Sequence, residues 1–234
     1  MLGTLYGVGV GPGDPELITL KALRILQSVP VIAWPAPENG PSLAREIVAG
    51  HLPGKQEEIA IRMPLFSSRF PADEVYDSAA AKIGKALQDG KDVAVICEGD
   101  PFFYGSFMYL FGRLSGIYRA EVVPGVSSLT ACAAALGAPL SAKNDVLTIV
   151  PGPLDAGQMR DRITEADSVA IIKVGRHLAK VRTVLEGLGI CESARYIERA
   201  TMAEQRILPL LDMKDDEAPY FSMILAHKRS EAWK

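Results

Sequence analysis

The first half of the chain alternates short apolar runs, rich in β-branched residues, with stretches that have helical spacing. The apolar runs cover residues 4–9, 31–34, 58–63 and 92–97. The helical stretches cover residues 15–28, 42–51, 73–89 and 104–114. This rhythm favours a largely parallel sheet, because two parallel strands are joined by a crossover that is usually a helix. We therefore expect an α/β fold.

The second half has a different pattern. Helical stretches cover 127–136, 154–166 and 178–188, and apolar runs typical of buried strands cover 146–150 and 169–174. Three extended stretches then follow, at 195–198, 206–211 and 220–226. This order predicts a hairpin-rich α+β domain rather than another parallel layer. We place the boundary at 115–120, which gives domains 1–117 and 118–234.

Composition excludes several classes of protein. The 234 residues are 48% hydrophobic and carry a net charge of −3, which argues against disorder and against nucleic-acid binding through bulk positive charge. The longest uncharged stretch, 122–142, is interrupted by proline and glycine and predicts no membrane span. Three cysteines and three histidines lack metal-ligand spacing. We expect no metal, no disulfide and no secretory signal, and hence a cytoplasmic protein.

The glycine-rich segment 7–16 invites comparison with the dinucleotide-binding pattern G-x-G-x-x-G, but its spacing fails. The last glycine of the pattern would have to stand where Pro12, Asp14 or Glu16 stands. The residues instead support a tight glycine turn, with Asp14 as a helix cap and Pro15 at the first helical position.

Two further segments follow predicted strands. The segment 97–105 comes after an apolar run, at the end of a parallel strand where ligands usually bind. Its carboxylates, Glu98 and Asp100, suit hydroxyl or ammonium groups better than phosphates. The segment 122–129 ends a strand in a turn that carries the Ser127 and Ser128 hydroxyls. The alternative for both segments is structural: an Asp-Pro turn, and serines that cap a helix.

Taken together and in this order, the three segments resemble those of the tetrapyrrole methylases, the S-adenosylmethionine-dependent enzymes of cobalamin and sirohaem synthesis. The residues that carry the resemblance are 8–14 with 17–22, 99–101 and 124–128. The resemblance implies two α/β domains with the active site in the cleft between them, a tetrapyrrole substrate, S-adenosylmethionine as methyl donor, and a homodimer. The segments 98–107, 173–176 and 218–222 look most like the branch that methylates precorrin-2 at carbon 20, giving precorrin-3A in cobalamin synthesis.

The resemblance also implies a set of cofactor-binding residues. Position by position these are Pro12, Glu98, Gly99, Asp100, Phe103, Ser127, Ser128, Val174 and Ala200. The chain departs from the family at several of them: the serine pair replaces a common Thr-Ala, Val174 replaces a common methionine, and Ala200 replaces a glycine found in some relatives. Glu98 stands where the branch that acts on uroporphyrinogen usually has glycine.

Methylation of a bridge carbon requires the loss of a proton, and no residue identifies itself as the acceptor. Asp100, Tyr104 and the nitrogens of the substrate itself remain candidates. A tetrapyrrole carries many carboxylates, so local cations are needed to hold it on a net negative protein. The candidates are Arg62, Arg69, Lys143, Arg176 and Arg199. The alternative for each is ordinary solvated surface charge.

Other functions remain open at this stage. The same methylation of a cobalt-containing substrate, in the anaerobic pathway, differs only in a metal that belongs to the substrate. A non-catalytic α/β ligand-binding module is a different class of protein, and the three retained segments argue against it. The failed glycine pattern argues against a nicotinamide oxidoreductase. The expected dimer has separate support, because Phe102, Phe103, Phe107, Tyr109 and Phe111 exceed what one helix face buries.

Overall fold

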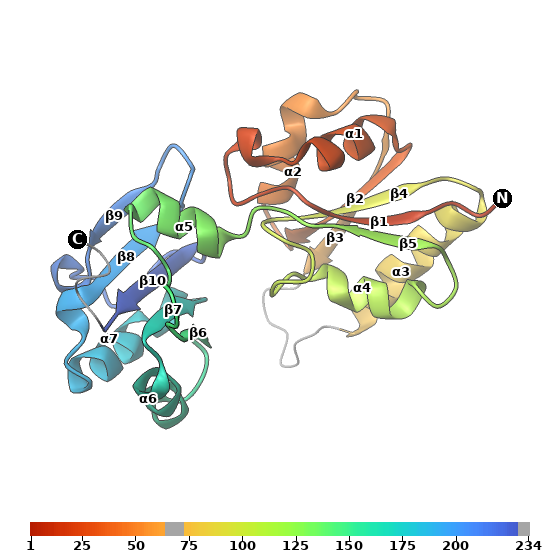
Figure 1. Cartoon of the computed structure of the whole chain (residues 1–234). Helices are drawn as coiled ribbons and strands as arrows, with labels where there is room; N and C mark the ends of the chain where they lie inside the picture. Colours follow the sequence, from red (N-terminus) through yellow and green to blue (C-terminus); the bar gives the residue numbers. More distant parts are fainter. Residues whose placement is uncertain (64–72, 229–234) are drawn as a thin grey trace. The chain divides into compact units, whose positions relative to one another are not determined.

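The computed structural model describes residues 1–63 and 73–228 and divides into two compact units, Met1–Ser127 and Ser128–Lys234 (Figure 1). The first unit extends beyond the predicted boundary at 117 and 118. The reason is strand β5 (Ala120–Val123), which pairs in parallel with β1 (Leu5–Gly9) and completes the first sheet. The sequence pattern alone does not show which sheet a strand joins.

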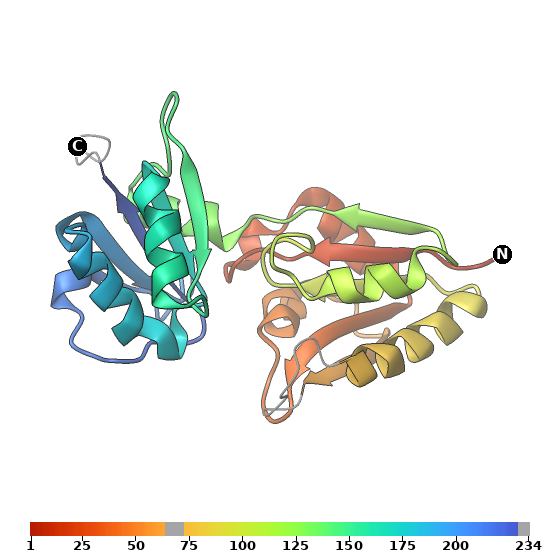
Figure 2. The ribbon, with the colours of Figure 1, turned by 90° about the horizontal axis from the view of Figure 1, so that it is seen from below.

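The first unit is an α/β layer, as the alternation of strands and helices predicts. The strand order is β3-β2-β4-β1-β5 and every pairing is parallel. The remaining strands are β2 (Val31–Pro37), β3 (Glu57–Met63) and β4 (Val93–Cys97). Helices α1 (Leu20–Ser28) and α2 (Leu43–Val48) cover one face of this sheet, and α3 (Asp73–Gln88) and α4 (Phe107–Leu114) cover the other (Figures 1 and 2).

Strand β4 shows why the apolar runs are continuous. Val93, Val95 and Cys97 belong to the core shared with α3 and α4, whereas Ala94 and Ile96 belong to the core shared with α1 and α2. Side chains of a strand alternate between its two faces, so a strand covered on both faces needs apolar residues at every position.

Two predicted helices of the first unit start differently from expectation. The predicted helix 15–28 is divided: the Asp14 side chain caps a short 3-10 turn, η1 (Pro15–Leu17), and Thr19 caps α1 separately. Ile18 lies between them in an extended conformation. The predicted helix 104–114 begins at Phe107 because Tyr104 has a φ of 56°, which a right-handed helix does not accept.

The second unit contains a mixed sheet of order β6-β7-β10-β8-β9. Its strands are β6 (Leu147–Pro151), β7 (Ser168–Ile172), β8 (Ala194–Glu198), β9 (Arg206–Pro209) and β10 (Ser222–His227). The hairpin character predicted from the three C-terminal stretches agrees with the antiparallel pairing of β8 and β9, whereas β6 and β7 pair in parallel. Helix α6 (Ala156–Glu165) makes that crossover and packs with α7 (Leu178–Gly187) on one face, while α5 (Ser128–Leu136) contacts β8. Within the described residues, no helix is long and apolar enough to cross a membrane.

The aromatic residues around α4 do not form one unburied face, contrary to the sequence argument for a dimer. Phe107 is fully buried in the core, and Tyr109 and Phe111 pack against that core. Phe102, 49% exposed, rests its ring against the rings of Phe107 and Phe111. Burial of aromatic side chains within the unit therefore accounts for much of the apparent excess.

We expect Phe107→Ala to lower the free energy of unfolding by about 3–5 kcal/mol, because it removes a buried ring and leaves a cavity. The matched control is Phe102→Ala, which removes a half-exposed ring from the same cluster and should cost about 1 kcal/mol. Urea unfolding of both variants measures the difference. Equal losses would contradict this account of the core.

Candidate functional site

The candidate site of the first unit lies at the carboxyl ends of β1, β4 and β5, which are neighbours in the first sheet. The loops that follow these strands are 10–14, 98–106 and 124–127, and we call them the first, second and third loops. Because the strands are parallel, their carboxyl ends meet at one edge, which is where open α/β sheets bind ligands. The structure thus brings the three sequence segments together.

The three loops approach each other backbone to backbone. The Gly99 N–H donates a hydrogen bond to the Gly11 carbonyl oxygen, with 2.8 Å between N and O. A Cβ on Gly9 would lie 2.5 Å from the Gly99 oxygen and 2.6 Å from the Gly125 nitrogen, and a Cβ on Gly125 would lie 2.0 Å from the Gly99 oxygen. These positions require glycine because a side chain has no room there.

The carboxylate of Asp100 ties the second loop to the third. Its Oδ1 accepts a hydrogen bond from the Phe102 N–H at 2.9 Å, and its Oδ2 accepts one from the Gly125 N–H at 3.0 Å. The turn that the sequence suggested as a structural alternative is therefore present. A carboxylate offers about four lone-pair directions, so these two bonds leave room to accept a ligand donor.

Glu98 connects the second loop to helix α2. Its Oε1 accepts a hydrogen bond from the Ala44 N–H at 3.1 Å, in the first turn of α2. Ser42, the residue in the N-cap position, donates its hydroxyl to the Pro35 carbonyl oxygen instead. Burial raises the pKa of the Glu98 carboxyl above its ordinary value of 4.5, and the hydrogen bonds from its own N–H and from the Ala44 N–H only partly offset that effect.

The other predicted residues of the first unit lie around these loops. Pro12 is buried, and Phe103 is half-buried with its ring centroid 5.2 Å from that of Tyr104. Tyr104 is 45% exposed and has a positive φ, a backbone conformation that costs energy for a bulky residue. Ser127 ends the first unit, and Ser128 begins α5 in the second.

A separate group of predicted residues lies within the second unit, at the edge of its sheet where β7 and β8 end and the antiparallel β10 begins. Ala200 is buried beside this edge, and the Val174 side chain packs in the core of the second unit. Two backbone hydrogen bonds join the segments at this edge. The Arg199 N–H donates to the Phe221 oxygen at 2.8 Å, and the Ala218 N–H donates to the Gly175 oxygen at 3.0 Å.

A buried polar pair at the same edge was not found by sequence reasoning. The hydroxyl of Tyr196, which is fully buried, donates a hydrogen bond to the Glu198 carboxylate, which is also buried. Burial, followed by the hydrogen bond to Glu198, raises the pKa of Tyr196. The i, i+2 spacing on a strand places both side chains on one face, but the sequence does not say that this face is buried.

Strained backbone surrounds this edge. Lys173, Arg199 and Thr201 have φ angles of 55°, 49° and 69°. Non-glycine residues in this region cost energy, and Thr201 is unusual because it is β-branched. Such residues cluster at functional sites, which supports a role for the segments after β7 and β8.

The predicted substrate-binding cations are not all placed alike. Arg176 and Arg199 lie at the edge just described, and Arg199 Nη1 is 3.8 Å from Glu198 Oε1. Lys143 precedes β6, which is parallel to β7, so it lies at the opposite edge of the second sheet and does not belong with them. Arg62 donates hydrogen bonds to backbone carbonyls of its own unit. Arg69 lies outside the described residues.

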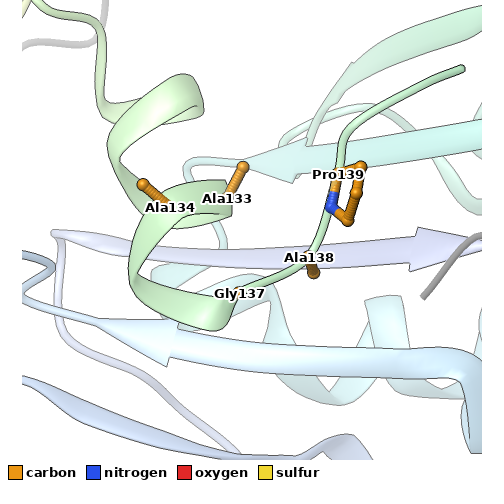
Figure 3. Close-up of a pocket in the computed structure, with 5 residues that line it drawn as sticks. All are labelled: Ala133, Ala134, Gly137, Ala138 and Pro139. Atoms are coloured by element: carbon orange, nitrogen blue, oxygen red, sulfur yellow. The ribbon is translucent and has the colours of Figure 1, made fainter. Parts of the chain in front are cut away.

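Other features of the chain contribute little to a site. In the described ranges, no three His, Cys, Asp or Glu residues are grouped so that they could hold a metal. All three cysteines are buried free thiols, and burial raises the pKa of Cys97 and Cys132 to about 12. A hollow of about 290 Å³ lies at the end of α5. It is lined by the five residues drawn in Figure 3, which are Ala133, Ala134, Gly137, Ala138 and Pro139. This apolar wall carries no chemistry of its own.

Residues 4–212 match the family model of tetrapyrrole (corrin/porphyrin) methylases. The chain belongs to the tetrapyrrole methylase family. The resemblance carried by the three segments is confirmed.

Several relatives of this tetrapyrrole methylase cover nearly all of it. It is 39% identical to the cobalamin biosynthesis protein CobIJ of Mycobacterium tuberculosis over 95% of this chain, but spans only 46% of that protein. It is 37% identical to a precorrin-2 C(20)-methyltransferase of Sinorhizobium over 96% of this chain and 95% of that one. It is 32% identical to the cobalt-precorrin-2 C(20)-methyltransferase of Salmonella typhimurium over 99% of both chains.

Solved structures share the fold of this methylase. A uroporphyrin-III C-methyltransferase from Thermus thermophilus, complexed with S-adenosylhomocysteine, matches with a TM-score of 0.71 and 25% identity, covering 96% of this chain and 97% of that one. The prediction of two α/β domains is therefore confirmed.

We expect Asp100→Asn to lower the free energy of unfolding by about 1–3 kcal/mol, because the amide nitrogen would face one of the two N–H donors and break one tie between the loops. Asp155→Asn is the matched control: Asp155 caps α6 by accepting one N–H, which asparagine does equally well. Chemical denaturation compares the two. If Asp100→Asn is as stable as the control, the carboxylate does not tie the loops.

The raised pKa of Glu98 makes a prediction about pH. Because the pKa is higher in the folded protein than its ordinary value, the stability contributed by this group is present below pH 4.5 and is lost as the pH rises through the folded pKa. Glu98→Gln keeps an oxygen for the Ala44 N–H but does not titrate. The unfolding free energy of wild type minus that of Glu98→Gln should therefore fall over the pH range that begins at 4.5 and ends above the folded pKa. A difference that stays constant over this range would contradict the assignment.

Proposed function

We propose that this chain transfers a methyl group from S-adenosylmethionine to carbon 20 of precorrin-2, giving precorrin-3A in cobalamin biosynthesis. The observation that carries the proposal is the similarity to the Sinorhizobium precorrin-2 C(20)-methyltransferase, which extends over almost the whole of both chains. Membership of a methylase family and the joined loops at the carboxyl edge of the first sheet agree with it. A non-catalytic ligand-binding module is disfavoured for the same reasons.

The three loops suit the proposed cofactor. Their backbone groups and the Asp100 and Glu98 carboxylates offer acceptors for the ammonium and ribose hydroxyls of S-adenosylmethionine, and Phe103 offers an apolar surface. The relative complexed with S-adenosylhomocysteine supports this choice. The full proposed set is Pro12, Glu98, Gly99, Asp100, Phe103, Ser127, Ser128, Val174 and Ala200. Val174 would act through its backbone, because its side chain packs in the core.

The residues present would work by position rather than by covalent chemistry. The cofactor supplies a methyl group on a positively charged sulfur, and the substrate supplies an electron-rich carbon. The protein has to align the two and exclude water. Both oxygens of Asp100 already accept a backbone N–H, which favours a positioning role for Asp100 over proton uptake. Arg176 and Arg199 are the proposed partners for substrate carboxylates.

The second candidate is the same methylation of a cobalt-containing precorrin-2, favoured by the similarity to the Salmonella enzyme over the full length of both chains. In that case the metal belongs to the substrate. Homodimer formation and a cytoplasmic location stay predictions of the family resemblance and the composition.

Incubation with labelled S-adenosylmethionine tests the proposal. In excess chelator, we expect one methyl group to be added to metal-free precorrin-2, detected by mass spectrometry, with the ¹³C label at carbon 20 in the NMR spectrum. Label at another carbon would refute the position of methylation, and turnover of the cobalt form alone would favour the second candidate. Calorimetry with S-adenosylhomocysteine measures cofactor binding separately, and Asp100→Asn should weaken it by about 1–3 kcal/mol.

A further inference from the structure

Strands β2 and β3 continue past the carboxyl end of β4, the neighbouring strand that leads into the second loop. Strand β2 pairs with β4 only from Val31 to Ala33, whereas its pairing with β3 continues to Pro37 opposite Met63. Pro35 and Pro37 have no N–H to give to a neighbouring strand, which is typical of a strand that leaves the sheet interior. The end of β2 and the residues after it therefore project beyond the carboxyl end of β4.

Arg62 holds the residues that follow β2, which we call the 37–43 segment. Its Nη1 donates hydrogen bonds to the carbonyl oxygens of Pro37, at 3.0 Å, and Gly40, at 2.9 Å. Gly40 has a φ of 111°, a conformation that glycine adopts readily. A charged donor on two carbonyls stabilises this turn more than neutral hydrogen bonds would.

Glu98 holds the other end of the same segment. The Ser42 hydroxyl closes the turn by donating to the Pro35 carbonyl oxygen at 2.7 Å. Helix α2 begins at the next residue, and its Ala44 N–H donates to the Glu98 carboxylate. Glu98 is followed directly by Gly99 and Asp100 of the second loop. The 37–43 segment is thus fixed to the loop that we propose binds the cofactor.

We propose that Arg62 is a positioning residue for the tetrapyrrole: it fixes the 37–43 segment as a wall beside the second loop, and this wall restricts how the macrocycle lies against the cofactor. The proposal rests on the proposed function. The loops after β1, β4 and β5 are the ones that we assign to the cofactor. Strand β2 is the next strand in the sheet, beside β4, and the 37–43 segment follows β2 at the same edge. Arg62 then acts through the backbone of this segment rather than by gripping a substrate carboxylate.

Hydrogen–deuterium exchange of the full chain, without ligands, tests the first step. In Arg62→Ala, amides of a peptide spanning 37–46 should exchange about tenfold faster, because the two charged hydrogen bonds are lost. Arg62→Lys should lie between wild type and Arg62→Ala, because one ammonium cannot reproduce the geometry of the guanidinium. Arg45→Ala is the matched control, since it removes an arginine of α2 that pairs with Glu58 at the surface. A peptide spanning 107–114, which packs in the core of the first unit, reports whether each variant is folded.

Steady-state kinetics tests the second step. Arg62→Ala should raise the KM for precorrin-2 about tenfold, while the Kd for S-adenosylhomocysteine stays within about twofold of wild type. Three outcomes would overturn the positioning role in an otherwise active enzyme. They are unchanged exchange in the 37–46 peptide, an unchanged KM, and a loss of cofactor affinity as large as the rise in KM. A higher KM with unchanged exchange would instead indicate that Arg62 binds a carboxylate directly. Wild-type protein that does not methylate precorrin-2 would overturn the proposed function, and the positioning role with it.

Discussion

The close backbone contact between the first, second and third loops is the constraint on which the candidate site depends. Gly9, Gly99 and Gly125 approach so closely that a single Cβ at Gly9 or Gly125 would collide with a neighbouring main chain. The Gly11–Gly99 bridge and the Asp100 carboxylate then hold the three loops in one arrangement. The glycine contacts join backbone to backbone and therefore occupy no side chain, and Asp100 keeps lone pairs for a ligand donor beside the two N–H groups it accepts.

This arrangement makes several polar residues serve the structure and the site together. Asp100 closes its own turn and ties the third loop, and Glu98 caps a helix that is distant in sequence. Arg62, predicted as a cation that binds the substrate, donates hydrogen bonds to two backbone carbonyl oxygens. The structural and functional alternatives that the sequence left open are therefore not exclusive, because a residue that holds a loop also determines what the loop presents.

The second unit shows where prediction from sequence was weakest. Its strands were located to within a few residues, but the parallel pairing of β6 and β7 and the insertion of β10 between β7 and β8 were not predicted. Pairing partners depend on contacts between distant segments, which local patterns do not report. For the same reason Lys143 was grouped with Arg176 and Arg199, although a strand's length separates them.

The sequence by itself determined the α/β character of the first unit, the family, and the order of the three glycine-containing segments. These follow from local periodicity and from residue types, such as the glycines and the Asp-Pro pair, that are typical of particular turns. Only the tertiary structure decided that β5 belongs to the first sheet, that Tyr196 and Glu198 form a buried pair, and that Arg62 holds the 37–43 segment. Each of these depends on which strands lie side by side, and hydrogen bonds between distant strands leave no periodic trace in the chain.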